Sequence, residues 1–402
     1  MRKKIFFLLL LICPINIFAI DLYSPKFVIY DNTDEKILLE KDYKENTSIA
    51  SLTKIMTAMV IIDGVDDLQN KITINYQMLN AVPSGAYVIY LQRGEVYTYE
   101  DLLYACLLPS AADAATSLAI AYSGSVSSFV EQMNNKAKEL GMENTNFTNP
   151  IGMDNGNNKS TLEDILTLLK YALNNNDFRT IYSTREYTMS NNKKVFSSLK
   201  MYNDDLHLGL DTSRIIGSKT GYTRNAGFAL SIVFESNTHE IISITVGAEH
   251  NNNSYHLRDG ISIINYIDQN YNIQTLLEKN NLLKELEVRD STIDKYNIYS
   301  NRELTKYLPN DYNKNDFKIE FNIPEFIDYK TEKNIGNIKY YFGDELLYTQ
   351  KVTINEEIKP TFWAIVRDNI IYIIIGFILL ISLIIFIILK KKKNKNEEIP
   401  VI

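Results

Sequence analysis

The chain has 402 residues and a formal net charge of −7 at pH 7. An acidic balance of this kind argues against a nucleic acid as its partner. Four His and two Cys residues are scattered along the chain. They predict no metal site, and we expect no cofactor.

Residues 1–19 have the composition of a secretory signal peptide, with a basic start, an apolar run over Ile5–Ile12 and a cleavage point after Ala19. We place Cys13 inside this segment, because the large isoleucine before it does not suit a lipidation site. Removal of the segment would leave Cys106 as the single cysteine and would exclude an internal disulfide bond.

The next part of the chain predicts a β-hairpin and then a helix that begins at a serine. Phe27–Tyr30 and Ile37–Leu39 flank a turn-forming sequence, and an apolar helical run extends from Ser51 to Gly64. Lys54 follows Ser51 at the i+3 position, so the two side chains share one helix face. A serine hydroxyl is a weak nucleophile without a neighbouring base, and lysine can serve as that base. The alternative for Ser51 is a plain helix N-cap.

The same Ser-x-x-Lys spacing recurs at Ser190/Lys193 and at Ser197/Lys200. Both copies lie in a polar stretch rich in Ser, Asn and Lys. We therefore predict a solvated loop or strand there and no chemistry.

Helical patterns come next in the chain, followed by strand patterns and a closing helix. The expected helices cover Thr98–Pro109, Ala112–Tyr122, Ser127–Leu140 and Thr161–Leu173, and the closing helix covers Ser254–Asn270. The expected strands cover Tyr187–Ser190, Lys194–Ser197, Gly217–Thr220, Phe228–Phe234 and Glu240–Val246. Strands at both ends with helices between them predict an α/β (α+β) domain over residues 20–272, in which a mainly antiparallel sheet is backed by a helical region.

Residues 273–360 predict a small β domain in which nothing looks catalytic. Its short strands are expected at Phe317–Phe321, Ile338–Phe342 and Leu346–Ile354, with turns at Gly336 and Gly343.

The C-terminal part predicts one transmembrane helix over residues 369–389. Ile370–Leu389 is an apolar run of about the 20 residues that cross a bilayer. Trp363 precedes the run, and a lysine cluster starts the tail, residues 390–402. Because positive charge stays on the cytoplasmic side, we expect a single-pass protein of the cell membrane with its body outside and its tail inside.

Five segments together resemble the D-alanyl-D-alanine carboxypeptidases, which are low-molecular-mass penicillin-binding proteins. These segments are Val28–Asp31, Ala50–Ala58, Leu108–Ala115, Thr145–Met153 and Gly217–Thr223. The small β domain and the C-terminal anchor also fit that family. The resemblance implies a transpeptidase/β-lactamase-like fold, peptidoglycan stem peptides as substrate and β-lactams as covalent inhibitors.

The resemblance also implies catalytic roles. Ser51 would attack the carbonyl between the last two D-alanines of the stem peptide, and Lys54 would accept its proton. The backbone N–H groups of Ser51 and Tyr222 would form an oxyanion hole, which is usually the largest electrostatic contribution in acyl transfer. Ser110 would relay a proton to the leaving amine.

Four further positions would bind substrate. Lys219 would supply positive potential, and Thr220 would contact the terminal carboxylate. Lys219–Gly221 would lie on an edge strand where an extended peptide can pair, and Gly221 would let the substrate backbone come close. Arg258 lies where the family has an arginine linked to carboxylate binding. The alternative for Arg258 is an ordinary exposed helical arginine.

Two positions depart from the family pattern. Ala112 stands where the family has the asparagine of Ser-x-Asn, which orders the lysine and accepts the substrate amide. Loss of one such positioning group can cost about 10²–10³ in rate. Ile151 stands where the family often has histidine.

Two other functions fit part of the pattern. A non-catalytic or weakly active peptidoglycan-binding scaffold would explain Ala112. A class A β-lactamase would share the serine, the lysines and Gly221, but it needs a glutamate to activate water. Lys170–Asn174 is the nearest match to that motif, and it has lysine in the glutamate's place. We rank the β-lactamase below the carboxypeptidase.

Overall fold

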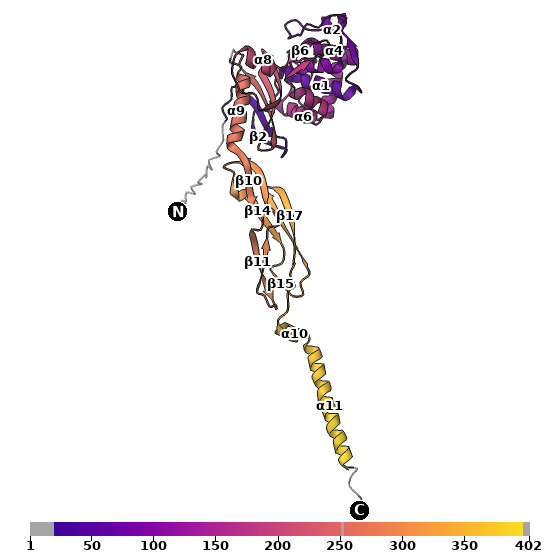
Figure 1. Cartoon of the computed structure of the whole chain (residues 1–402), viewed down its shortest axis with the longest axis vertical. Coiled ribbons are helices and arrows are strands. Elements are labelled where there is room, and N and C mark those ends of the chain that lie inside the picture. The colour runs from indigo at the N-terminus through magenta and orange to yellow at the C-terminus, as the bar shows by residue number, and fades with distance from the viewer. Residues whose placement is uncertain (1–19, 251–252, 397–402) are drawn as a thin grey trace, which may run out of the picture. The chain divides into compact units, whose positions relative to one another are not determined.

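The computed structural model of the protein describes residues 20–250 and 253–396, with side chains as far as residue 392. The predicted signal peptide lies outside the described residues. The chain divides into two compact units, of which the first ends at Tyr271 and the second begins at Asn272. Figure 1 shows both units.

The first unit contains the following elements, in chain order: β1 (Lys26–Asp31), β2 (Lys36–Lys41), the 3₁₀ turn η1 (Ala50–Leu52), α1 (Thr53–Gly64), β3 (Lys71–Thr73), α2 (Tyr76–Asn80), β4 (Val96–Thr98), α3 (Tyr99–Leu107), α4 (Ala112–Ser123), α5 (Val126–Glu139), α6 (Leu162–Leu173), α7 (Asn176–Ser183), β5 (Glu186–Thr188), β6 (Lys194–Phe196), α8 (Ser198–Asp205), β7 (Ile215–Thr223), β8 (Gly227–Ser236), β9 (His239–Ala248) and α9 (Tyr255–Asn270).

An antiparallel sheet with the strand order β2-β1-β9-β8-β7 organises this unit. Neighbouring residues of β8 face opposite sides of the sheet, as strand geometry requires. Leu230 and Ile232 face α9, where Gly260 allows a close approach, and Ala229 and Val233 belong to the core shared with the helical region. The α+β class and the β1–β2 hairpin are confirmed, and β7 is an edge strand.

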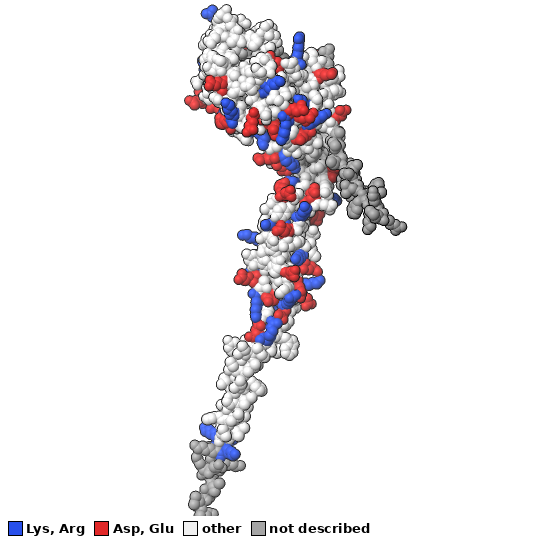
Figure 2. All heavy atoms as spheres, turned by 180° about the vertical axis from the view of Figure 1, so that it is seen from behind, with Lys and Arg blue, Asp and Glu red and all other residues white. Residues whose placement is uncertain are grey.

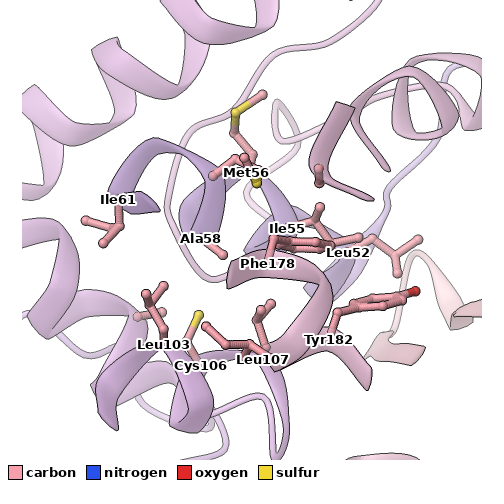
Figure 3. Close-up of a cluster of buried hydrophobic side chains, with 14 of the residues drawn as sticks. Leu52, Ile55, Met56, Ala58, Ile61, Leu103, Cys106, Leu107, Phe178 and Tyr182 are labelled. Carbon is pink, nitrogen blue, oxygen red and sulfur yellow. The ribbon is translucent and has the colours of Figure 1, made fainter. Parts of the chain in front are cut away.

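The helical region packs around α1, in which every residue from Thr53 to Ile62 is buried. Figure 3 shows the surrounding core, in which side chains of α1 meet Leu103, Cys106 and Leu107 of α3 and Phe178 and Tyr182 of α7. A helix buried on all sides must satisfy its polar groups inside the protein. Lys54 and Thr57 therefore need partners within the fold.

The predicted capping residues begin their helices. Thr98 and Asp101 form a reciprocal capping box at the start of α3. Thr161 accepts the N–H of Asp164 at the start of α6. Gly141 follows α5 with φ of +75°, a conformation that glycine adopts without strain.

The prediction for Ser197–Lys200 was wrong, because this stretch begins a helix. The buried Ser197 caps α8 by accepting the N–H of Lys200. Two short helices, α2 and α7, were not predicted either. Asn175 caps α7, and this helix lies against β7, where Gly217 leaves room for the ring of Tyr182.

The second unit contains β10 (Tyr271–Leu277), which starts at the last residue of the first unit, β11 (Leu282–Arg289), β12 (Lys295–Tyr299), β13 (Leu304–Pro309), the 3₁₀ turn η2 (Lys314–Asp316), β14 (Phe317–Asn322), β15 (Phe326–Asp328), β16 (Asn334–Phe342), β17 (Glu345–Thr353), α10 (Phe362–Asp368) and α11 (Ile370–Asn396). Small sheets share one core. Gly343 lies in the β16–β17 turn as predicted. Gly336 does not mark a turn, because it lies within β16 at a register shift, with φ of +129°.

The apolar C-terminal run forms the single helix α11, whose segment Ile370–Lys392 is long and apolar enough to cross a membrane. Figure 2 shows an uncharged surface along this helix, followed by lysines towards its end. Its apolar side chains are exposed. Exposed apolar surface of this extent is consistent with a membrane anchor.

Candidate active site

The first unit contains an open cleft of about 920 Å³ in which most of the predicted site residues meet. Five segments form its walls: η1 with the start of α1, the 84–87 loop, the loop before α4, the 151–154 loop, and β7 with the turn after it. Residues of α8 complete the lining. The lining includes Ser51, Lys54, Ser110, Ala112, Thr220, Gly221 and Tyr222.

Ser51 and Lys54 contact each other directly. Lys54 Nζ donates a hydrogen bond of 3.0 Å to Ser51 Oγ. No side-chain cap bond occurs at the start of η1 or α1. The plain N-cap interpretation of Ser51 is therefore wrong, and its hydroxyl is directed to the lysine.

Lys54 is suited to act as a base because it is almost fully buried. Burial is the main cause that lowers the pKa of Lys54 to about 8. The nearby Cys106 and Asp113 have a smaller, opposite effect and raise this pKa. A second bond of 2.7 Å joins Lys54 Nζ to the carbonyl oxygen of Ile151. Asn149 Oδ1 holds this loop by accepting the N–H groups of Ile151 (3.2 Å) and Gly152 (2.8 Å). The backbone at the position of the family's histidine thus orients the lysine.

Ser110 lies in the cleft wall with an unusual backbone, at φ of +67°. Its Oγ is buried and has no hydrogen-bond partner among the described residues. A buried hydroxyl without a partner is costly in a folded protein, and such strain is frequent at functional sites. Ala112 N donates to Tyr87 O at 2.7 Å, so the loop that carries Tyr87 is tied to the start of α4.

The edge strand β7 brings Lys219–Gly221 close to Ser51. A Cβ on Gly221 would lie 2.7 Å from Ser51 N and 3.0 Å from Ala50 Cβ. Glycine is needed here because β7 closely approaches η1, which is a different reason from the predicted approach of substrate. The adjacent Tyr222 has 38% of its surface exposed and lines the cleft.

Lys219 and Thr220 are both buried, and of the two only Thr220 lines the cleft. Burial, with a further contribution from the charge of Lys54, lowers the pKa of Lys219 well below its usual value. Its Nζ donates to Thr220 O at 2.7 Å, and Thr220 Oγ1 lies 2.5 Å from Ser198 Oγ. Ser198 belongs to α8, the helix that the sequence did not predict.

Arg258 does not line the cleft. It is half-buried in α9, and its Nε donates to Asn253 O at 3.0 Å. Its role in carboxylate binding remains a prediction. A different arginine, Arg224, lines the cleft just after β7.

Comparison with protein families matches residues 17–250 to D-alanyl-D-alanine carboxypeptidase, the family Peptidase_S11. The chain belongs to the D-alanyl-D-alanine carboxypeptidase family. It is therefore an enzyme of the serine peptidase class, and its function in the cell wall follows from the family.

The sequence of this chain is similar to those of carboxypeptidases from several bacteria. DacF of Bacillus subtilis is 25% identical over 347 residues, which are 83% of this chain and 85% of that protein. The enzyme of Streptomyces sp. strain K15 is 36% identical over 46% of this chain, and DacC of Escherichia coli is 29% identical over 56%. These last two alignments span 66% and 56% of the relatives' own lengths.

Solved structures share the fold of this carboxypeptidase. Penicillin binding protein 5 from Haemophilus influenzae has a TM-score of 0.59 at 22% identity, with 84% of this chain and 98% of that chain covered. The Streptomyces K15 DD-transpeptidase has a TM-score of 0.54 at 27% identity, with 61% of this chain and 97% of that chain covered.

Sequence reasoning missed several residues that line the cleft of the carboxypeptidase: Tyr87, Asp154, Tyr202, Asp205 and Arg224. Arg224 could have been found, because it directly follows Gly217–Thr223, the last of the five segments that resemble the family. The others lie on separate loops and on α8, and no local pattern connects them to the serine.

One group of possible metal ligands, Asp31, Asp34 and His239, lies outside the cleft lining. The sequence analysis did not anticipate it. His239 Nδ1 lies 2.9 Å from Asp31 Oδ2, and Asp34 forms a 3.2 Å ion pair with Lys36. Asp31 Oδ1 accepts the N–H groups of Thr33 and Asp34. These contacts account for the group's geometry without an ion.

Proposed function

We propose that the chain is a membrane-anchored serine D-Ala-D-Ala carboxypeptidase that removes the terminal D-alanine of peptidoglycan stem peptides through an acyl-enzyme on Ser51. The contact of 3.0 Å between Ser51 Oγ and Lys54 Nζ, in the wall of an open cleft, is the observation that carries this proposal. It combines a nucleophile, a base and room for a peptide.

In the acylation step, neutral Lys54 takes the proton of Ser51 while Oγ bonds to the carbonyl carbon of the penultimate D-alanine. The negative charge that forms on the carbonyl oxygen is stabilised by the N–H groups of Ser51 and Tyr222. A lysine with a pKa of about 8 is well matched to this task near neutral pH.

In the second half of acylation, the C–N bond breaks and the leaving amine of D-alanine takes a proton through Ser110. Water then hydrolyses the ester and restores Ser51. Thr220 binds the substrate carboxylate, and Lys219 supplies positive potential behind it. Burial and the charge of Lys54 lower the pKa of Lys219, so the positive charges of the two buried lysines oppose each other.

Labelling with a fluorescent penicillin and release of D-alanine from a pentapeptide test this proposal. We expect a covalent label on Ser51, found by peptide mapping, and no label in Ser51→Ala. A label on Ser190 or Ser197, or no label on any serine, would contradict it.

The second candidate is a weakly active or non-catalytic peptidoglycan-binding scaffold, and Ala112 favours it. The hydrogen bond from Lys54 Nζ to the carbonyl oxygen of Ile151 favours the enzyme, because this bond orients the lysine without an asparagine. Penicillin labelling distinguishes the carboxypeptidase from the scaffold, because the scaffold would not acquire a label. A β-lactamase ranks below both, since Asp154 and Asp205 are the described carboxylates that line the cleft and neither bonds to Ser51.

We also infer that β-lactams inhibit this enzyme covalently and that α11 crosses the cell membrane once. The lysines after the apolar segment favour a cytoplasmic tail. The catalytic domain, residues 20–272, then lies outside, where peptidoglycan is found.

A further inference from the structure

Two charged side chains at one end of the cleft have no assigned role. Asp154 Oδ2 accepts only a long hydrogen bond of 3.3 Å, from Asn225 N. Its Oδ1 is buried and has no hydrogen-bond partner among the described residues. Arg224 is exposed beside it in the cleft wall and forms no ion pair with any described residue. A carboxylate with spare acceptor capacity and an unpaired guanidinium in one cleft wall can bind a charged ligand group.

The direction of the bound peptide follows from β7. In the proposed function, the substrate carboxylate lies at Thr220 and the scissile carbonyl lies at Tyr222 N. Continuing in this direction beyond Thr223, the last residue of β7, leads to Arg224 and Asn225 in the turn that follows the strand. The peptide therefore runs antiparallel to β7, and the residue before the penultimate D-alanine reaches the end of the cleft where Asp154 and Arg224 lie.

The length of the substrate agrees with this placement. An extended chain advances about 3.3–3.6 Å per residue, so the α-carbon of that third stem-peptide residue lies about 5 Å from the scissile carbonyl.

We propose that Asp154 and Arg224 form the recognition site for the side chain of the third stem-peptide residue and select one that ends in an ammonium group. Asp154 accepts the ammonium. Arg224 pairs with a carboxylate where the side chain carries one next to the ammonium, as in diaminopimelate. This inference rests on the proposed function, because the peptide is placed by the acyl-enzyme chemistry at Ser51.

A second carboxylate in the cleft lining provides a matched control. Asp205 forms no hydrogen bond or ion pair with any described residue, and it lies at the end of α8. Because Asp205 belongs neither to the 151–154 loop nor to the turn after β7, Asp205→Asn should not affect discrimination at the third residue.

The test compares two tripeptides that differ in one charge, Nα-acetyl-L-Lys-D-Ala-D-Ala and its Nα,Nε-diacetyl form. We expect the full chain in detergent to release D-alanine from the free ammonium substrate with about tenfold higher kcat/KM, and Asp154→Asn to reduce this ratio to about two or less. Asp205→Asn should keep the wild-type ratio. Arg224→Gln should keep it as well, but should lose the preference for a diaminopimelyl peptide over the lysyl peptide.

Two results would overturn the inference: a wild-type enzyme that does not distinguish the two tripeptides, or a preference that Asp154→Asn keeps and Asp205→Asn removes. The rate of penicillin acylation of the wild type is measured in parallel, as a separate test of the chemistry at Ser51. Failure of acylation in the wild type would contradict the proposed function instead. Binding of the same two peptides to Ser51→Ala needs no turnover, so equal dissociation constants there would overturn the recognition site independently.

Discussion

At the scale of single residues, the catalytic chemistry depends on where one proton lies. Lys54 has two acceptors, Ser51 Oγ and the carbonyl of Ile151, and little contact with water. Burial penalises the ammonium form, so the lysine gives up its proton in a pH range where an exposed lysine does not.

The rate of Ser51 acylation should therefore rise with pH and reach half of its plateau near pH 8. Below that pH, Lys54 is protonated and cannot accept the serine proton, whereas above it the base form dominates. The measurement is the second-order rate of penicillin acylation between pH 6 and pH 10, with circular dichroism as the control for folding. A flat profile, or one that falls towards pH 9, would exclude Lys54 as the base.

Replacing Ala112 by asparagine should raise the release of D-alanine by about tenfold, since a restored hydrogen bond in the transition state lowers the barrier by about 1–3 kcal/mol. Ala112 is buried at the cleft wall, so the added amide points at the reaction centre only if the wall leaves room for it. The assay is D-alanine release from a stem pentapeptide, with thermal melting as the control. Equal or lower activity in a stable variant would show that Ile151 has fully replaced the asparagine.

At the scale of elements, the candidate active site lies where the edge strand β7 contacts the 3₁₀ turn η1. The turn carries Ser51, the strand carries Lys219–Gly221, and Gly221 allows the two elements to touch. The proposed oxyanion hole takes one N–H group from each element, so its geometry would depend on their separation.

Gly221→Ala should lower the acylation rate by about 10²-fold or more, because a shift of about 1 Å in a positioned group can cost that much. The added Cβ would meet backbone at 2.7 Å, which forces β7 and η1 apart. Gly260→Ala is the matched control, since its Cβ would meet only side-chain methyl groups, Leu230 Cδ2 at 3.2 Å and Ile232 Cδ1 at 3.5 Å. If both variants acylate at the wild-type rate, the strand–turn contact does not set the oxyanion hole.

At the scale of the whole molecule, one chain combines a catalytic unit, a small β unit and an apolar helix. The second unit has its own core, and α11 exposes its apolar side chains. Within the second unit, α10 is tied to the β strands by an ion pair of 2.8 Å between Arg367 and Asp290 and by contacts of Lys330 and Tyr329 with Asp368.

A chain that ends before Asn369 should be released from membranes as a soluble protein that still binds penicillin. The reason is that α11 provides the uninterrupted apolar length that a bilayer needs. The measurement is fractionation after salt and carbonate washes, with the full chain as the control that stays in the membrane. A truncated form that remains in the membrane fraction would mean that the anchor lies elsewhere or that the signal segment is retained.

The sequence alone was sufficient for several features that depend on local spacing. The i, i+3 positions of Ser51 and Lys54 set their contact through helix geometry, capping residues mark helix starts, and an apolar run of sufficient length predicts α11. By contrast, the start of α8 was misread, because Ser197–Lys200 is polar in composition and becomes buried only by packing.

The tertiary structure decided what holds the site together. The carbonyl that orients Lys54 comes from a residue 97 positions away. Gly221 is glycine because of a turn that lies far from it in the sequence, and Asp154 meets the end of β7 through another loop. No local pattern encodes these contacts, since each arises only when separate segments pack around the buried α1 and the sheet. For the same reason, the proposed choice of the third stem-peptide residue could be inferred only from the folded chain.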